Sequence, residues 1–385
     1  MTVLPRIEAF AEDLTAIRRD IHAHPEIGFE EARTAGLVAE LLESWGIEAH
    51  RGVGRTGVVG VLRGAREGAR AVGLRADMDA LPIHETTNLP WRSTVPGVMH
   101  ACGHDGHTTM LLGAARYLAE TRDFAGTVHF VFQPAEEGLG GARAMLTDGL
   151  FDRFPCDEIY GLHNAPNLDL GQVAVLPGRA MAGASFFDIR VHARGSHAAR
   201  PQDSRDPVVI AAALVQALQS VVSRNLDPLD AGVLSVTRLQ AGSAYNVIPE
   251  EAHLAGTIRF FDDRVGALVA ERVRAICAGI AQAFDCRVEA DIRDVFTVLE
   301  NDPEGARAIR EAAAEVVGEA GLVPDPRPVT GSEDFADMLR AVPGAYAWVG
   351  HGGDVPLHNP AYVLDDAVLP IGASILARLV ERRLA

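Results

Sequence analysis

The sequence has little cysteine and too few basic residues to balance its acidic ones. Its four cysteines are scattered along 385 residues, which is too sparse for a disulfide scaffold. It has 35 lysine and arginine residues against 52 aspartate and glutamate residues, giving a net charge of -17. Because nucleic-acid binding depends on basic side chains that neutralise phosphates, this balance argues against a nucleic-acid partner. A locally basic pocket for a small anion stays open.

Long apolar runs are missing as well. No stretch approaches the roughly 18 consecutive apolar residues that a membrane span needs. The first residues have neither an apolar signal region nor a small-residue cleavage site. We therefore expect a cytoplasmic protein with no membrane partner. A reducing compartment would also keep the Cys102 thiol available as a metal ligand.

The chain is longer than one compact core usually serves, so we expect two domains. Its first half alternates strand-like and helix-like segments, which predicts a mostly parallel sheet covered by helices. The expected helices are 14–23, 30–45 and 108–120, and the expected strands are 56–62, 71–76, 127–132 and 158–162. A later strand is expected at 345–349.

The hydrophobic pattern changes near residue 185. Apolar and polar residues then alternate, which is typical of half-buried strands, and two long helical segments are interspersed. The resulting order β-α-β-β-α-β is that of a ferredoxin-like α+β domain. We predict that 183–295 forms an inserted domain, and that 1–182 and 296–385 together form one α/β domain that is split in sequence.

The segment 100–107 concentrates a thiol, three imidazoles and a carboxylate between flexible glycines. Cys102 and His104 are separated by one residue, so in an extended segment both side chains would face the same way. Thiolate and imidazole together suit zinc or a similar first-row ion. The alternative is a buried free cysteine beside a core histidine. For His100 and His107, surface or capping roles are the better interpretation.

Further ligand-type residues follow the expected strands. Glu136 and Glu137 come after 127–132, His163 comes after 158–162, and His358 lies beyond 345–349. Ligands bind beyond the carboxyl ends of the strands in such sheets. The sequence therefore predicts one metal-dependent hydrolytic site at this edge.

Adjacent side chains such as those of Glu136 and Glu137 cannot point the same way, so we expect the two carboxylates to have different roles. One would bind metal while the other acts as the general base for an attacking water. Solvated loop carboxylates are the alternative. Asp79 could orient a metal ligand, or it could cap the turn before Pro82. Asp77 is ambiguous and stays outside the predicted ligand set.

Three polar residues of the predicted inserted domain are candidates for contact with a substrate. His197 could stabilise negative charge on a tetrahedral intermediate, although a lone loop histidine is more often solvated. Arg259 could bind a carboxylate with both arms of its guanidinium, and an exposed strand arginine is an equal alternative. Asn246 is the third candidate.

These motifs resemble the metal-dependent amidohydrolases of the M20 peptidase group. The resemblance is strongest to the branch with hippurate hydrolases, bacterial N-acyl-amino-acid amidohydrolases and plant auxin-conjugate hydrolases. The matching stretches run in order along nearly the whole chain, and the Cys-Gly-His segment is specific to this branch. They are residues 19–26, 75–82, 102–104, 133–138, 161–164, 195–201, 245–250 and 330–335.

The resemblance implies a di-metal exopeptidase-like catalytic domain with an inserted dimerisation or lid domain. It implies two divalent ions per subunit bound by Cys102, His104, Glu137, His163 and His358, with Glu136 as general base and Asp79 as the ligand-orienting carboxylate. It further implies that His197 acts in the partner subunit of a homodimer, and that Asn246 and Arg259 meet the substrate carboxylate. Other branches have a His-x-Asp pair where this chain has Asp77 and Asp79.

The expected reaction is hydrolysis of small N-acyl-amino acids, with hippurate-like, N-acetyl or indoleacetyl groups, to a carboxylic acid and a free amino acid. The ligand set suits Mn, Zn, Co or Ni and does not choose among them. Two alternatives stay open. Cys102 could be a thiol nucleophile activated by His104 in a metal-free enzyme, or the chain could be a non-catalytic binding protein that keeps the fold.

Overall fold

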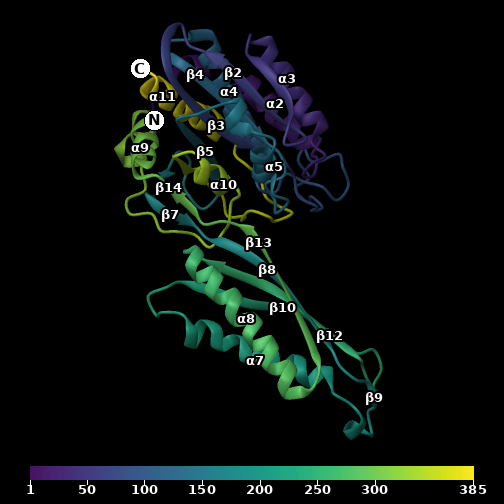
Figure 1. Cartoon of the computed structure of the whole chain (residues 1–385). Helices are drawn as coiled ribbons and strands as arrows, with labels where there is room; N and C mark the ends of the chain where they lie inside the picture. Colours follow the sequence, from purple (N-terminus) through teal and green to yellow (C-terminus); the bar gives the residue numbers. More distant parts are fainter. The chain divides into compact units, whose positions relative to one another are not determined.

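The computed structural model describes all 385 residues and divides into two compact units. The first unit comprises Met1–Ala180, Glu300–Pro328 and Asp334–Ala385, and the second comprises Met181–Leu299 with Val329–Glu333. The sequence division, at 182/183 and 295/296, left 329–333 with the first unit. Residues 329–333 group with the second unit because the backbone N–H of Ala182 donates to the carbonyls of Val329 and Gly331. The chain passes between the units at the short strands β7 and β14 (Figure 1), which are Gly178–Met181 and Leu299–Asn301.

The first unit is built on a seven-stranded sheet with the order β1-β2-β4-β3-β5-β15-β6. The four neighbouring strands β4, β3, β5 and β15 are parallel, and the outer strands β1, β2 and β6 join antiparallel. This confirms the α/β class with a mostly parallel sheet. The strands are β1 Glu48–Val53, β2 Gly57–Arg63, β3 Arg66–Asp77, β4 Ala125–Gln133, β5 Glu158–Ala165, β6 Val173–Ala174 and β15 Gly344–Gly350.

Helices cover both faces of this sheet. The largest apolar cluster lies between the sheet and α3, α4, α9 and α11, while α5 and α10 pack against the other face. Residues such as Val72, Leu74, Phe130 and Phe132 are fully buried in it because both faces are covered. The helices of this unit are α1 Pro5–Glu8, α2 Ala11–Ala23, α3 Ala32–Ser44, α4 His104–Thr121, α5 Gly141–Thr147, α6 Leu150–Arg153, α9 Pro303–Val317, α10 Phe335–Ala341 and α11 Val368–Arg383. A short 3-10 helix spans Glu319–Gly321.

Two boundaries differ from the sequence prediction in ways that matter for the site. Helix α4 begins at His104, four residues before the predicted start, because Gly103 precedes it in the left-handed region with φ 85°. The segment before α4 is irregular and not extended as we expected. Strand β5 continues to Ala165, so His163 lies inside the strand and not after it.

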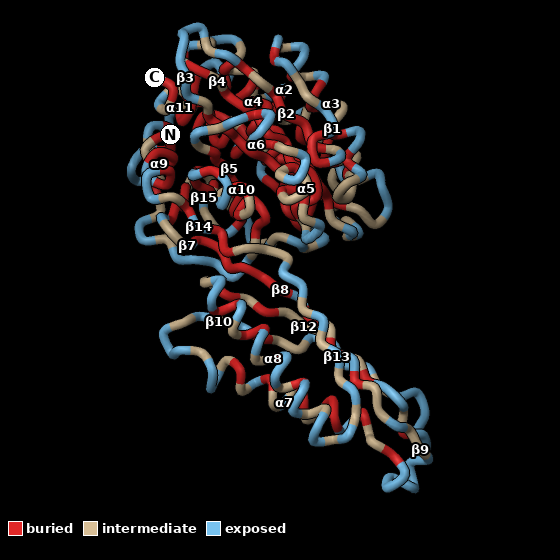
Figure 2. The backbone as a smooth tube through the Cα atoms, viewed as in Figure 1, coloured by how far each residue is buried: buried red, intermediate tan, exposed pale blue.

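The second unit has a four-stranded antiparallel sheet with the order β10-β12-β8-β13, covered by two helices. This is the strand order of a ferredoxin-like domain. Buried and exposed residues alternate along β8, whereas β4 and β5 of the first unit are buried almost throughout (Figure 2). The elements are β8 Gly183–His192, α7 Pro207–Asn225, β10 Gly232–Ala241, β12 Glu251–Phe260, α8 Asp263–Phe284 and β13 Arg287–Phe296.

Helix α7 is long and apolar enough, by length and composition alone, to cross a membrane. One such helix is weak support for a span, because core helices have the same character. Its residues Ile210, Leu214 and Leu218 are fully buried in the apolar cluster shared with the sheet and α8. The start of α7 is capped by the Asp206 carboxylate, which accepts the Val208 N–H at 2.9 Å.

The segment that carries His197 lies outside this sheet, beyond the end of β8, which is a central strand. It forms β9 (Ser196–His197), which pairs antiparallel with β11 (Val247–Ile248) in a separate two-stranded ribbon. A 3-10 turn at Pro201–Asp203 follows. The edges of the four-stranded sheet are therefore β10 and β13.

Candidate active site

The parallel strands of the first unit bring the predicted polar residues to one edge. Asp79 follows the end of β3, and Glu136 and Glu137 follow the end of β4. His163 lies near the end of β5, and His358 lies in the segment after β15. Carboxyl ends of parallel strands meet at the same sheet edge, which is where such folds bind ligands.

Cys102, His104 and His163 form a first group of potential ligands. One ligand atom from each lies within 4.8 Å of the others, and all three residues are buried. Cys102 Sγ lies 3.5 Å from His163 Nε2. Sulfur and two imidazole nitrogens at this spacing are a typical donor set for a first-row divalent ion.

A second group shares the same sulfur. Cys102, Glu137 and His358 also bring ligand atoms within 4.8 Å of one another. Glu137 Oε1 lies 3.3 Å from His358 Nε2. The side chains of Cys102 and Glu137 raise the pKa of the His358 imidazole to about 10. The two groups together use all five predicted ligands, with Cys102 common to both.

Hydrogen bonds orient the two buried imidazoles for metal binding. His163 Nδ1 lies 2.6 Å from the carbonyl of Asn164, which can only accept, so the proton is on Nδ1 and Nε2 carries a lone pair. His104 Nδ1 similarly lies 3.2 Å from an oxygen of Asp79. His104 Nε2 is buried without any hydrogen-bond partner. Such an orphaned atom is costly in a protein interior, and a metal ion would satisfy it.

Asp79 contacts two of the predicted ligands at once. Its Oδ1 faces His104, and its Oδ2 accepts the backbone N–H of Glu137 at 3.0 Å. The carboxylate therefore fixes both an imidazole and the chain segment that carries a ligand carboxylate. This geometry fits the ligand-orienting role better than the alternative of a turn cap.

Glu136 and Glu137 do not diverge as their adjacency led us to expect. An oxygen of each lies within 4.8 Å of a ring nitrogen of His104. Both can face the same place because they lie in a turn and not in a regular strand. Only Glu137 also joins the group with Cys102 and His358, while Glu136 Oε1 lies 3.4 Å from the backbone nitrogen of Asp334.

His100 and His107 are buried, so the prediction of surface or capping roles for them is wrong. His107 Nε2 accepts the backbone N–H of Asn164 at 2.9 Å, and its Nδ1 lies 2.6 Å from Asp77 Oδ1. Both ring nitrogens of His107 are therefore occupied, which leaves none for a metal. Burial lowers the pKa of His100 to about 4, so its ring is neutral at pH 7.

A buried polar network behind the ligands escaped the sequence reasoning. Asn164 donates to the carbonyl of Cys102 at 2.6 Å and accepts the hydroxyl of Tyr362 at 2.7 Å. Arg75 bridges Asp77 at 2.7 Å and Asp334 at 3.4 Å. Burial alone would raise the pKa of Asp77, but His104, His107 and Arg75 hold it well below its usual range. The matched motifs contain most of these residues, and nothing in the sequence assigns them partners.

The surroundings of Cys102 argue against a thiol nucleophile. Burial and the Glu137 carboxylate raise the pKa of the thiol, whereas an activated nucleophile needs a lowered one. The sulfur also lies 3.5 Å from Nε2 of His163, so more than the proposed base His104 surrounds it. With its pKa raised, the thiol would lose its proton on binding a metal cation.

The three candidates in the second unit have different surroundings. His197 Nδ1 accepts the backbone N–H of Ala199 at 3.1 Å, which places a hydrogen on Nε2 of the exposed ring and leaves it free to donate. Arg259 is half-buried, and its Nη1 donates to the hydroxyl of Thr257 and to the carbonyl of Ile258. Burial lowers its pKa, and no carboxylate pairs with it. The Asn246 side chain is exposed.

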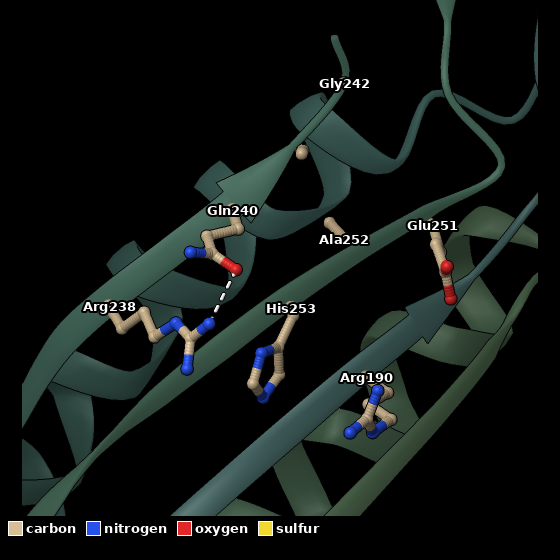
Figure 3. Close-up of a pocket in the computed structure, with 8 residues that line it drawn as sticks. Arg190, Arg238, Gln240, Gly242, Glu251, Ala252 and His253 are labelled. Carbon is tan, nitrogen blue, oxygen red and sulfur yellow. Dashed lines mark hydrogen bonds between the residues drawn. The ribbon is translucent and has the colours of Figure 1, made fainter.

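A hollow of about 500 Å³ lies on the four-stranded sheet of the second unit (Figure 3). Arg238, His253 and Arg190 line it from three neighbouring strands, and Arg238 donates to Gln240 at 2.8 Å. None of the predicted site residues lines this hollow, and its lining residues belong to none of the groups that could hold a metal ion. The hollow is therefore separate from the candidate active site.

Comparison with known proteins places this site in a family. Residues 73–382 match the model of peptidase family M20/M25/M40. A hippurate hydrolase of Campylobacter jejuni is 42% identical over 384 residues, covering 100% of both chains. An N-acetylcysteine deacetylase of Bacillus subtilis is 39% identical, covering 97% of each.

A solved structure agrees in fold. The Bacillus subtilis YXEP protein, described as a dinuclear metal binding peptidase from the M20 family, superposes with a TM-score of 0.84. It is 35% identical, over 98% of this chain and 99% of that one. The resemblance read from the motifs is thereby confirmed. The chain belongs to peptidase family M20/M25/M40 and is a metal-dependent amidohydrolase.

Proposed function

We propose that this chain hydrolyses small N-acyl-amino acids to a carboxylic acid and a free amino acid. The observation that carries the proposal is the pair of ligand groups that share Cys102, with the Glu136 carboxylate beside the ligand His104 of the first group. The relatives named for hippurate and N-acetylcysteine support this substrate class. A cytoplasmic location stays a prediction from the sequence.

Two divalent ions would be held by Cys102, His104 and His163 on one side and by Cys102, Glu137 and His358 on the other. Bound there, such ions supply Lewis acidity that lowers the pKa of a water molecule and polarises an amide carbonyl. The mixed sulfur, nitrogen and oxygen donors suit Mn, Zn, Co or Ni.

Glu136 would act as the general base. Its carboxylate would take a proton from the attacking water and later deliver that proton to the departing amine nitrogen. Asp79 would keep His104 in the tautomer that leaves Nε2 free, as its 3.2 Å contact with Nδ1 indicates. His197 would donate a hydrogen bond from Nε2–H to the oxygen that becomes negative during the attack.

Arg259 and Asn246 would bind the carboxylate end of the substrate. A half-buried guanidinium without a carboxylate partner is costly to keep, and a substrate carboxylate would compensate its charge. Phe186, whose ring lies 5.9 Å from the Arg259 guanidinium, would shield that contact from water. The acyl group stays unassigned among hippurate-like, N-acetyl and indoleacetyl compounds.

We also propose a homodimer formed through the second unit. Its sheet has two open edges, β10 and β13, and exposed edge strands readily pair with a copy of themselves. Val233 and Leu239 on β10 are both more than 40% exposed. This favours β10 as the shared edge. His197 would then serve the active site of the partner subunit.

The adjacent glutamates provide the test. Glu136→Gln keeps the side-chain size but cannot accept a proton, so turnover should fall by about 10²-fold or more while the metal content is retained. Glu137→Gln removes a charged ligand, so the metal content should fall as well. Mass spectrometry measures the bound metal of each variant. Turnover is measured as amino-acid release from N-benzoyl, N-acetyl and indoleacetyl amino acids.

The exposed neighbour of the pair, Leu139, supplies the control. Leu139→Ala changes the same turn without touching a carboxylate and should keep both metal and turnover. If Glu136→Gln lost metal and Glu137→Gln retained it, the roles assigned to the two glutamates would have to be exchanged. Full turnover in Glu136→Gln would remove the general base from the proposal.

A further inference from the structure

The turn that carries Glu136 contains a backbone conformation that its sequence does not favour. Ala135, directly before Glu136, has φ 54° in the left-handed region. Residues other than glycine rarely adopt this region, because Cβ comes too close to the backbone. Such conformations persist only where surrounding structure holds them. The direction of the Glu136 side chain depends on this residue, so whatever holds Ala135 also aims the proposed base.

Both backbone polar groups of Ala135 are held by other residues. Its carbonyl accepts the N–H of Gly141 at 3.0 Å, which closes the turn from within. Its N–H donates to Glu31 Oε1 at 2.8 Å, a buried bond between residues 104 positions apart. Glu31 is thus the long-range partner of the strained residue.

The carboxylate of Glu31 is built for this contact. The residue is fully buried, and its second oxygen accepts the hydroxyl of Thr56 at 2.5 Å. Glu31 stands at the start of helix α3, but the capping of that helix is done by Glu26, which accepts the N–H groups of Arg33 and Thr34. Glu31 therefore makes no capping bond of its own.

The chain just before Glu31 fits closely against the same turn. A Cβ placed on Gly28 would come within 2.9 Å of Ala135 Cα and 2.8 Å of Leu139 Cδ1. The contact with Ala135 is to backbone, so it could not be relieved by rotating a side chain. Gly28 therefore packs closely against Ala135, and Glu31 accepts its N–H, although both lie far from Ala135 in sequence.

We propose that Glu31 is a positioning residue for Glu136: it holds Ala135 in the left-handed conformation that directs the base toward the reaction centre. This inference rests on the proposed role of Glu136. The buried Glu31 carboxylate makes no contact with the predicted metal ligands. Its substitution should therefore affect proton transfer and leave metal binding intact.

The first experiment compares Glu31→Ala, Glu31→Gln and Glu30→Ala in the metal-loaded enzyme. Glu31→Ala should lower kcat by about 10- to 100-fold, as expected for a misplaced reacting group, with KM changed by less than about threefold. Glu31→Gln keeps an acceptor oxygen for the Ala135 N–H and should recover most of kcat. Glu30 is exposed, so Glu30→Ala should match wild type. Bound metal should be equal in all four proteins.

The second experiment tests whether Glu31 acts through Ala135. Glycine adopts the left-handed region freely, so Ala135→Gly should make the turn less dependent on its partner. The fold-loss in kcat caused by Glu31→Ala should be at least about threefold smaller in the Ala135→Gly background than in wild type. Gly28→Ala displaces Ala135 with Glu31 intact and should lower kcat with metal retained. It replaces Glu31→Ala if that variant does not fold.

Several results would overturn the inference. One is a Glu31→Ala enzyme with wild-type kcat, and another is an equal loss of kcat in both backgrounds at position 135. A loss of bound metal that accounts for the loss of kcat would make Glu31 merely structural. Failure of the proposed function is distinguishable, because it would appear as full turnover in Glu136→Gln whatever the Glu31 variants do.

Discussion

Most candidate functional residues of the first unit are buried, His358 being exposed, whereas most of those in the second unit are exposed. In the first unit Cys102, His104 and His163 are all less than 10% exposed, and their hydrogen bonds are fixed before any ligand arrives. In the second unit His197 and Asn246 are exposed, and His197 uses only one ring nitrogen within its own chain. The chemistry that needs fixed geometry is thus built into a core, while residues that contact substrate wait at a surface.

The difference follows from what each unit can bury. Helices cover both faces of the first sheet, so polar side chains at its edge can be surrounded and paired. The sheet of the second unit has helices on one face only, and its polar residues lie on the other. Polar residues there pair with neighbours across the open face, as His253 does with Asp188 at 2.7 Å, and these pairs stay accessible to solvent.

Metal removal should have the largest effect and should separate the site from the fold. Chelator-washed protein should lose turnover by more than about 10³-fold, since neither a metal-activated water nor the Lewis acid remains. Its far-UV circular dichroism should be nearly unchanged, because the apolar clusters of both units contain no metal ligand. Turnover should return when Mn or Zn is added. Full activity of chelator-washed protein would restore the thiol-nucleophile alternative.

A second buried cluster of the first unit, around His22, should make the free energy of unfolding depend on pH in the alkaline range. His22 lies 2.8 Å from Asp105 and 3.4 Å from Glu85. Burial opposes its charge, but these two carboxylates raise its pKa to about 9. Because the folded-state pKa lies above the unfolded one, the stabilisation is complete below pH of about 6.5 and is lost as pH rises through 9. The free energy of unfolding should fall by about 3 kcal/mol over this pH range.

Chemical denaturation of wild type, His22→Gln and His197→Gln at pH 6.5 and 9.5 measures this loss. Wild type should lose about 3 kcal/mol more than His22→Gln between the two pH values. His197→Gln alters an exposed ring of the second unit and should follow wild type. Equal pH dependence in all three proteins would mean that the His22 network contributes nothing to stability.

The smallest expected effect concerns the proposed service of His197 across a dimer. Mixed His197→Ala and Glu136→Gln chains should regain up to about a quarter of wild-type activity, because random exchange makes half the dimers mixed and each has one complete site. Each variant alone should be inactive or nearly so. Native mass spectrometry checks subunit exchange. No recovery despite exchange would assign His197 to its own subunit or to no catalytic role.

Much of the site could be predicted from sequence because its ligands are chemically distinctive and follow buried strands. The edge carrying Glu136, Glu137 and His163 follows from strand-helix alternation, and the structure brings all five predicted ligands into two groups. The errors were local. His107 lies in α4 because that helix begins early, at His104, and no periodicity in the sequence shows where Gly103 turns the chain.

The sequence by itself determined the two-unit α/β plan, the donor types of the site and its family, because apolar periodicity and residue chemistry are written along the chain. Only the tertiary structure decided which ring nitrogen of His104 lacks a partner, that Asp77 pairs with His107, and that Glu31 reaches Ala135. The reason is physical. Pairing of buried polar groups depends on contacts between residues tens to hundreds of positions apart, and such contacts leave no local pattern in the sequence.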